Sequence, residues 1–383
     1  MEIQLLRNIG SGLLAILLSV VTSCEKIESG SDTLTVSVRE DNVKSKSGYV
    51  FVSVKTSGKW TLDLDFNGGA EWAQLNVTSG NGENNGILLQ FEENDGETSR
   101  TLRVLASSAG LKSECSFTQL SALQSEMVPS DKVRNWMELP ATDDETLLFI
   151  THDMEVGEKN IRNYSYYWDA DNLVARWVAY PLNKGLIGSG SRTDEWGLDP
   201  KLPRKLQPVL NRGYRGGYDR GHQLPSADRL SRKANIKTFY GTNMTPQLGS
   251  LNQNGWATLE GAVRDWAGAF DTLYVVTGCT VEGSTKIAYD NDGKEVTVPT
   301  GYYKALLGYQ KNPTISITPT TRGYTGIAFY YPHEGYSGGY MAKSMTIDAL
   351  EELVKVDFFV NLPATIGDDL ASKVEATKDS WWK

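Results

Sequence analysis

Residues 218–222 read YDRGH and residues 242–247 read TNMTPQ, and these two short runs decide how the sequence is interpreted. Three further residues follow them at intervals of four: Asn252, Trp256 and Glu260. His222, in the first run, is one of three histidines in a chain of 383 residues. Because the pKa of an imidazole lies near neutrality, a rare histidine in such a context is a candidate for acid–base chemistry.

The segment around His222 is the most basic part of an acidic chain. The formal net charge of the whole chain is -9, yet positions 201 to 237 contain ten Lys or Arg and only two acids, a local excess of +8. Such a concentration of positive charge is typical of a surface that binds a polyanion. A basic stretch by itself is more often a solvated surface, so this interpretation depends on its overlap with the motif.

The residue types predict chemistry on a phosphate. A neutral imidazole can take a proton from water, and Mg²⁺, held by one or two protein oxygens, can stabilise the developing charge. Asn252 and Glu260 are eight residues apart, slightly more than two helical turns, so we expect them to share a helix face with Trp256. Asn252 would then bind the metal directly and Glu260 through a water molecule.

Each residue also has a plainer structural interpretation. The DRGH run could be a turn in which Gly221 takes a positive φ and His222 merely packs. Asn243 and Asn252 could cap helices, and Glu260 could lie on a solvated face. Their joint occurrence at these spacings favours the functional interpretation.

The two runs together resemble those of the DNA/RNA non-specific endonucleases. The resemblance rests on the following residues: Asp219-Arg220-Gly221-His222, Pro225, Ala227, Asp228, residues 243–247, Asn252, Trp256 and Leu259-Glu260, with Trp177 to Tyr180 and Asp199-Pro200 as flanking matches. Enzymes of this family have a ββα-metal site and cleave DNA and RNA without sequence specificity.

The resemblance implies a role for each candidate residue. His222 is the general base, Asn252 binds Mg²⁺, with Mn²⁺ able to replace it, and Glu260 binds waters of the metal. Asn243 orients the site. Three arginines contact phosphate: Arg192, Arg220 and Arg264. Of these, Arg220 also adds positive charge at the catalytic centre.

Residues 33–122 show a different pattern, with apolar residues at every second position. This period of two predicts half-buried strands over 34–38, 49–54, 60–64, 87–91 and 101–105. About seven short strands separated by Gly-, Asn- and Ser-rich turns predict an all-β sandwich. The segment resembles the BACON domains, which are Ig-like modules. Trp60 and Trp72 could stack on a carbohydrate, but core positions are the more frequent role for such residues.

Residues 1–24 have the features of a targeting segment. An apolar run from 13 to 21 follows Arg7 and is too short for a membrane-spanning helix. Its end, VTSC at 21–24, resembles a bacterial lipobox, which implies lipidation of Cys24 and a membrane anchor in the bacterial cell envelope, periplasmic or outer. An ordinary secretory peptide with a chance cysteine is the alternative.

The remainder of the chain predicts a mixed domain behind a linker. Strands are expected at 147–152, 163–168, 174–180, 272–278, 298–307 and 326–331, and helices at 259–270, 346–354 and 368–383, the last on the surface. A zinc site built from His152, His222, His333 and Cys279 is conceivable, but no pair has ligand-like spacing.

We therefore expect an α+β protein with the following parts: a lipoprotein signal peptide (1–24), an all-β Ig-like sandwich (33–122), a linker (123–145) and a ββα-metal nuclease domain with a central antiparallel sheet (146–383). The expected reaction is Mg²⁺-dependent hydrolysis of phosphodiester bonds in DNA and RNA. The competing interpretation is a glycan-binding or adhesin lipoprotein with an inactive nuclease-like domain. It is disfavoured because none of the four central residues is missing: His222, Asn243, Asn252 and Glu260.

Overall fold

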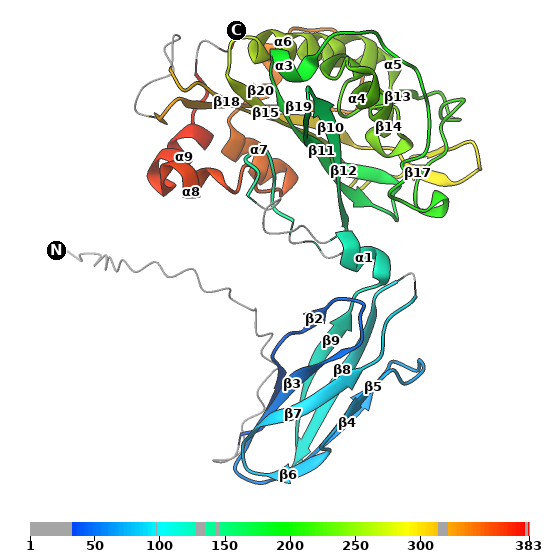
Figure 1. Ribbon diagram of the computed structural model, residues 1–383, viewed down its shortest axis with the longest axis vertical. Coiled ribbons are helices and arrows are strands. Elements are labelled where there is room, and N and C mark those ends of the chain that lie inside the picture. The colour runs from blue at the N-terminus through cyan, green and yellow to red at the C-terminus, as the bar shows by residue number, and fades with distance from the viewer. Residues whose placement is uncertain are drawn as a thin grey trace, which may run out of the picture. The chain divides into compact units, whose positions relative to one another are not determined.

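The computed structural model describes residues 33–96, 98–127, 135–142, 144, 146–312, 321–379 and 382. The expected signal peptide, with Cys24, lies outside this range. The chain divides into two compact units, Met1–Glu126 and Met127–Lys383, which are coloured blue to cyan and green to red in Figure 1. Within the described part of the chain, the helices are all too short or too polar to cross a membrane.

The first unit contains two sheets around one core. The first sheet has the order β1 (Thr35–Val38), β3 (Gly48–Lys55), β7 (Asn84–Phe91) and β5 (Ala73–Leu75). The second has the order β2 (Asn42–Val43), β9 (Leu111–Gln119), β8 (Arg100–Ser108), β4 (Lys59–Asp65) and β6 (Ser79–Asn81). Alternate side chains of both sheets, such as Val52 and Leu102, meet in a single hydrophobic cluster. The period of two in the sequence therefore corresponds to an all-β sandwich, which is followed by the short helix α1 (Ala122–Met127).

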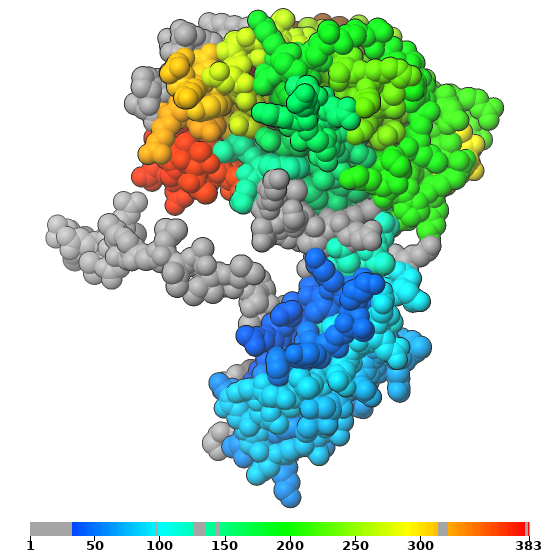
Figure 2. Space-filling view, viewed as in Figure 1, coloured from blue at the N-terminus to red at the C-terminus, as the bar shows by residue number. Residues whose placement is uncertain are grey.

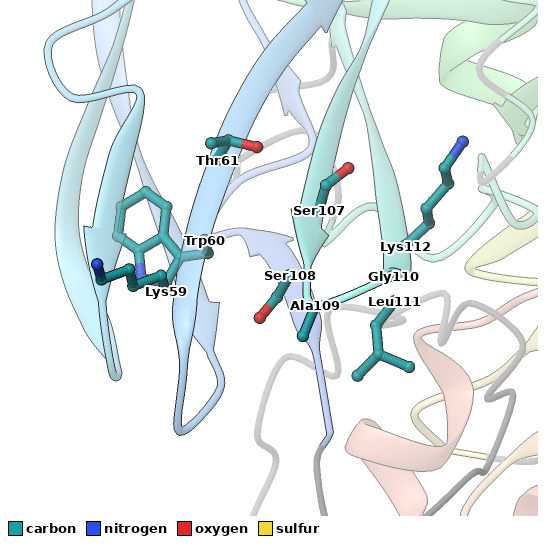
Figure 3. Close-up of a pocket in the computed structure, with 9 residues that line it drawn as sticks. All are labelled: Lys59, Trp60, Thr61, Ser107, Ser108, Ala109, Gly110, Leu111 and Lys112. Atoms are coloured by element: carbon teal, nitrogen blue, oxygen red, sulfur yellow. The ribbon is translucent and has the colours of Figure 1, made fainter.

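Trp60 and Trp72 are core residues of this sandwich. Their exposed fractions are 2% and 7%, and a Cβ added at Gly80 would lie 2.3 Å from the Trp60 ring. The Trp60 indole N–H donates to the Gly82 carbonyl at 2.8 Å. A shallow depression of about 300 Å³ lies beside Trp60, between β4 and the turn that joins β8 to β9 (Figure 3). The core alternative is thus confirmed for both tryptophans, and neither offers a free face to a sugar.

The second unit is built on a seven-stranded antiparallel sheet. Its order is β10 (Leu148–Val156), β11 (Lys159–Asp169), β12 (Val174–Leu182), β15 (Thr272–Thr280), β18 (Gly301–Tyr309), β19 (Tyr324–Pro332) and β20 (Ser344–Met345). The first six correspond to the expected strands. They are buried along most of their length because helices cover both faces of the sheet (Figure 1).

Two groups of helices flank the sheet. On one face, Ala328 of β19 belongs to a cluster with residues of α7 (Ile347–Val354), α8 (Leu362–Ile366) and α9 (Asp368–Glu375). On the other face, the neighbouring Phe329 stacks on Trp266 of α6 (Ala257–Ala267) at 6.0 Å between ring centroids. The shorter helices of the unit are α3 (Lys184–Ile187), α4 (Arg232–Lys237) and α5 (Gly249–Leu251).

Two small strand pairs lie outside the main sheet. The first pairs β13 (Asp219–His222) with β14 (Met244–Gln247), and the second pairs β16 (Ile287–Tyr289) with β17 (Glu295–Thr297). Both pairs are antiparallel. The motif histidine is therefore on a short strand followed by a loop, rather than in a tight turn.

The two ends of the second unit differ from what the sequence suggests. Leu139, in the expected linker, is 2% exposed in the main core, and the carbonyl of Trp136 accepts a hydrogen bond from Asn361 at 2.8 Å. At the other end, the expected helix stops at Glu375. Trp382 is fully buried, 5.0 Å from Trp266 between ring centroids. The expectation of a surface helix to residue 383 is wrong, because this tryptophan closes the core over α6.

A buried carboxylate joins the first two strands of the sheet to the segment before the motif. Asp199 Oδ2 lies 2.7 Å from His152 Nε2 on β10 and accepts hydrogen bonds from Tyr166 on β11 and Thr242, at 2.6 and 3.1 Å. Burial raises the pKa of Asp199, but the hydrogen bonds from His152 and Tyr166 outweigh it and hold the pKa below its ordinary value. The ionised form is thus the one that the fold stabilises.

We predict that Asp199→Asn destabilises the second unit by about 3 kcal/mol at pH 7, because it removes a buried negative charge to which several groups are hydrogen-bonded. A group with a lowered folded pKa contributes stability above its unfolded pKa of about 3.9, and that stability is lost as the pH falls through the folded value. Urea denaturation at pH 7 and below pH 4 measures both effects. Asp292→Asn, which breaks an exposed pair with Arg204, should change stability by less than about 1 kcal/mol; equal effects of the two substitutions would contradict the prediction.

Candidate functional site

The motif strand is held by an unusually close approach to its partner. In the β13–β14 pair, Gly221 lies opposite Thr245 and His222 opposite Met244. A Cβ added at Gly221 would come within 2.3 Å of Gln247 Oε1 and 2.7 Å of Gln247 Cβ. Gly221 is not among the residues with positive φ. The glycine is required by this contact, and the alternative of a turn with positive φ is wrong.

Asn243 fixes the loop that leaves the motif. Its side chain is buried, and its Nδ2 donates to the carbonyls of Leu224 and Thr238 at 2.9 and 2.8 Å, while its Oδ1 accepts from the Leu224 N–H at 2.9 Å. These three bonds join both ends of the segment that contains η2 (Ser226–Asp228) and α4. Asn243 therefore holds the backbone of this segment, and the orienting role that the resemblance implies for it stays a prediction.

His222 is kept neutral by its surroundings. Burial, then the charge of Arg192, lower its pKa to about 3, although the Arg220 backbone opposes the shift. Its ring meets Phe239 and Trp196 edge-on, at 5.2 and 5.7 Å between centroids. Its buried Nε2 has no hydrogen-bond partner among the described residues. A buried nitrogen without a hydrogen-bond partner destabilises a fold. The nitrogen is therefore available to accept a hydrogen bond from a water molecule.

Two of the three candidate arginines lie beside this imidazole. Arg220 is packed with its guanidinium carbon 3.4 Å from the centroid of the Trp196 ring, and its Nη1 donates to the carbonyls of Leu210 and Asn211 at 2.8 and 3.2 Å. Burial and then the charge of Arg192 lower the pKa of Arg220. Arg192 is half-exposed, is bound to Asp194 at 2.8 Å, and lines a depression of about 370 Å³. Two cations beside a neutral imidazole are an arrangement that can attract an anion.

The third arginine, Arg264, belongs to a separate charged group with Glu260. Arg264 on α6 forms an ion pair with the buried Asp228 at 3.1 Å. Burial raises the pKa of Glu260 to about 7, with Lys304 as the main opposing influence. Lys304 is buried on β18, donates to Thr277 at 3.1 Å and lies 4.8 Å over the Trp256 ring.

Asn252 is tied to the motif by the first residue of DRGH. The Asp219 carboxylate accepts from Asn252 Nδ2 at 3.0 Å and from Gln253 Nε2 at 2.8 Å. With its NH₂ group engaged in this way, Asn252 presents its amide oxygen elsewhere, and the structure records no hydrogen bond to that oxygen within the described ranges. Asp219 thus orients a metal-ligand candidate, a role that the sequence interpretation missed.

The helix between Asn252 and Glu260 is not regular. Asn252–Trp256 forms a π-helical turn between α5 and α6, and the Gly255 N–H in it donates to the Tyr336 carbonyl at 2.9 Å. Trp256 is 1% exposed and packs on Tyr302 and Tyr331, whereas Glu260 is half-buried. The segment is therefore not α-helical throughout, but Trp256 and Glu260 still lie near each other, because Lys304 lies over the Trp256 ring and also acts on the pKa of Glu260. Single π turns of this kind occur frequently at functional sites.

The donors present suit a hard cation better than zinc. An uncommitted amide oxygen and one carboxylate match the preference of Mg²⁺ for few protein oxygens and several waters. In the part of the chain that the structure describes, no group of three or more His, Cys, Asp or Glu side chains is arranged so that it could hold a metal ion. His333 binds the Pro299 carbonyl through Nδ1 at 2.7 Å and accepts from the Leu248 N–H through Nε2 at 2.8 Å, so both of its nitrogens are engaged.

Comparisons with known proteins identify the family of the chain. The sequence profile of the DNA/RNA non-specific endonucleases matches residues 149–365. The chain belongs to this family. A nuclease from Nostoc sp. is 33% identical over 229 residues, which cover 59% of this chain and 81% of that protein. Mitochondrial endonuclease G from Bos taurus is 34% identical over 159 residues, 39% of this chain and 53% of that protein. A chain of the crystal structure of the EndoG/EndoGI complex is 24% identical, covers 55% of this chain and 87% of its own length, and has a TM-score of 0.43.

As a member of the non-specific endonuclease family, the chain is a nuclease, and its second unit contains the matched region. All candidate residues of the nuclease site lie within residues 149–365. The all-β unit lies outside that range. Two contributors to the site had escaped the sequence interpretation besides Asp219: Trp196, beneath Arg220, and Lys304. Lys304 had a signal, because it is the one charged residue of an otherwise uncharged run, GYYKALLGY at 301–309.

We predict that Gly221→Ala destabilises the nuclease unit by about 1 to 3 kcal/mol, the usual cost of overpacking, because the methyl group would overlap Gln247. Gly261→Ala is the matched control, since nothing lies within 4 Å of the added Cβ on α6. That change should stabilise the helix by up to about 1 kcal/mol. Thermal melting of both variants checks the prediction, which fails if Gly221→Ala melts at or above the wild-type temperature.

Proposed function

We propose that this nuclease is an Mg²⁺-dependent endonuclease that hydrolyses DNA and RNA without sequence preference, with His222 as the general base. The observation that carries the proposal is the buried Nε2 of His222, which lacks a partner among the described residues and lies close to Arg192 and Arg220. The imidazole can accept a proton, and the arginines attract the phosphate next to it. The pKa of His222 is shifted by burial and by two arginines, and no carboxylate contributes to the shift.

Binding of the phosphate changes the basicity of His222. A pKa of about 3 describes the site without substrate, where burial and positive charge disfavour an imidazolium. A phosphodiester between the arginines and the imidazole adds negative charge, which raises the pKa of the base at the moment when it must take a proton. The Arg220 guanidinium is already oriented by Trp196 and two carbonyls, so little of its ordering entropy is lost on binding.

Asn252 and Glu260 are the residues that would hold Mg²⁺. The Asn252 amide oxygen would bind it directly, and the Glu260 carboxylate through water. When bound, the metal supplies positive charge that stabilises the negative charge developing on the phosphate and on the leaving oxygen. Asp219 keeps the Asn252 amide in position, and Asn243 keeps the loop after His222 in place.

The absence of sequence preference follows from the kind of groups that the site offers. Guanidinium and imidazole groups that contact phosphate carry no information about the bases. The sugar is not read by any residue that we assign. DNA and RNA are therefore both expected as substrates.

We also propose that the protein is a lipid-anchored component of the bacterial cell envelope with a BACON-like first unit. Residues 13–24 and the resemblance of the sandwich segment support this proposal. Mass spectrometry of the mature N-terminus tests it: an N-terminus that begins elsewhere than at an acylated Cys24 would overturn it. A glycan-binding protein with an inactive nuclease-like unit is the weaker alternative, since both candidate sugar-stacking tryptophans are buried.

We predict that His222→Ala lowers kcat for plasmid nicking by about 10² to 10⁴-fold, the range for loss of a general base, while substrate binding persists. Asn252→Ala should instead raise the Mg²⁺ concentration required for half-maximal activity and recover in part at high Mg²⁺ or Mn²⁺, because a lost ligand weakens affinity first. Wild-type activity of His222→Ala, or full activity of the unmodified enzyme in EDTA, would refute the mechanism.

We predict that the apparent affinity for Mg²⁺ falls as the pH drops below about 7, where Glu260 becomes protonated. The sign follows from the raised pKa: the carboxylate that binds metal waters is present above that pH and absent below it. Calorimetric Mg²⁺ titrations between pH 5.5 and 8.5 measure the effect, and Glu260→Gln should bind more weakly with no such pH dependence. A variant that retains the wild-type pH dependence would show that another group is responsible.

A further inference from the structure

The segment that precedes the motif is fastened to the β16–β17 hairpin. Six hydrogen bonds of 2.7 to 3.1 Å connect residues 209–215 with residues 289–291: Arg215 N to Tyr289 O, Tyr289 N to Arg215 O, Asn291 N to Val209 O, Val209 N to Asp290 Oδ2, Arg212 N to Asn291 Oδ1, and Asn291 Nδ2 to Gly213 O. In the space-filling view, yellow atoms of the hairpin lie among the green atoms of this earlier segment (Figure 2). The two segments therefore form one fixed surface.

The same segment touches the catalytic arginine. Arg220 donates to the carbonyls of Leu210 and Asn211, and a Cβ added at Gly213 would lie 3.8 Å from Arg220 Nε. Arg215 precedes Arg220 by five residues, which span at most about 17 Å. A stacked strand advances about 3.4 Å per nucleotide. A strand bound at Arg220 thus reaches Arg215 within about five nucleotides.

The side chains on this surface suit a flanking nucleotide. Arg212 and Arg215 are exposed, and the structure records no ion pair for either within the described residues. Tyr289 is 40% exposed, and the Arg215 guanidinium carbon lies 5.8 Å from the centroid of its ring.

Two of the three nearby acids are engaged with other groups. Asp290 is buried and accepts three backbone N–H bonds, and Asp292 is paired with Arg204. Glu295 makes only a long contact of 3.4 Å with the Tyr289 hydroxyl. The surface therefore presents two arginines, one acid and an aromatic ring, and its segment 209–215 contacts Arg220.

We infer that Arg215 and Tyr289 form a second subsite of the nuclease, at which a nucleotide of a single-stranded DNA or RNA segment flanking the scissile bond binds, its phosphate at Arg215 and its base against Tyr289. The inference rests on the proposed function and extends it. Aromatic rings bind bases without regard to sequence, and an adjacent cation strengthens the contact. Cleavage should therefore depend on the length of the substrate.

Steady-state kinetics on a single-stranded DNA 12-mer and on a dinucleotide test the subsite. Tyr289→Ala should raise KM for the 12-mer about 10-fold, as expected for loss of one stacked base, with kcat unchanged and the dinucleotide unaffected. Tyr289→Phe keeps the ring and should behave as the wild type. Arg215→Ala should reduce the slope of log affinity against log salt by about 0.7, the contribution of one phosphate on a single strand, and Arg215→Lys should retain it.

Lys373→Ala, which removes an exposed cation from α9, is the control for net charge and should change neither KM nor the salt slope. Tyr289→Ala with wild-type KM on the 12-mer overturns the inference, as does an equal rise in KM for the dinucleotide. A wild-type protein that cleaves neither substrate overturns the proposed function instead. In that case, fluorescence anisotropy with the labelled 12-mer still decides the subsite: about 10-fold weaker binding by Tyr289→Ala supports it, and unchanged binding overturns it.

Discussion

The carboxylate of Asp219 is the point at which the two parts of the site meet. It lies on β13, next to the motif arginine and three residues before His222, and it binds the Asn252 amide at the start of the π-helical turn. Together with the bond from Gln253, this bond joins the strand of His222 to the turn that contains the metal-ligand candidate. The close packing of Gly221 on Gln247 and the hydrogen bonds of Asn243 serve the same end, because each fixes one flank of the short strand that contains Asp219.

Charge is distributed unevenly across the site, between a side around His222 and a side around Glu260. Beside His222 the charged side chains are arginines whose countercharges are few: Arg220 is bound to carbonyls, and Arg192 to one exposed acid. Around Glu260 the charges alternate, with Asp228, Arg264 and Lys304 in mutual reach. The first side lacks negative charge, which a phosphate supplies. On the second side the positive and negative charges nearly balance, and this limits how strongly any single cation is held there.

The sequence predicted those features that depend on periodicity and on residue type. Strands of the sheet such as β12 and β15 were recognisable as apolar runs, because helices cover both faces and leave no exposed row. The π turn at Asn252 was not recognisable, since it depends on the contact of Gly255 with Tyr336, about eighty residues away in the chain. The burial of Trp382 likewise depends on a gap over Trp266 that only the folded chain defines. The role of Asp219 was predictable only in part, because it arises from the contact of one motif residue with another.

Burial acts in opposite directions on the two titrating groups of the site, and this links substrate and metal. Desolvation disfavours the charged form of each, so it lowers the pKa of His222 to about 3 and raises that of Glu260 to about 7. In the proposed mechanism, a ligand of opposite charge would favour the charged form of each group: a phosphate would favour the imidazolium that forms during the reaction, and a cation would favour the carboxylate. A phosphate that binds near His222 also attracts a cation to Glu260, and a bound cation attracts the phosphate. The two ligands should therefore bind cooperatively, and the low polarity that makes each group a poor ion alone is the cause of that coupling.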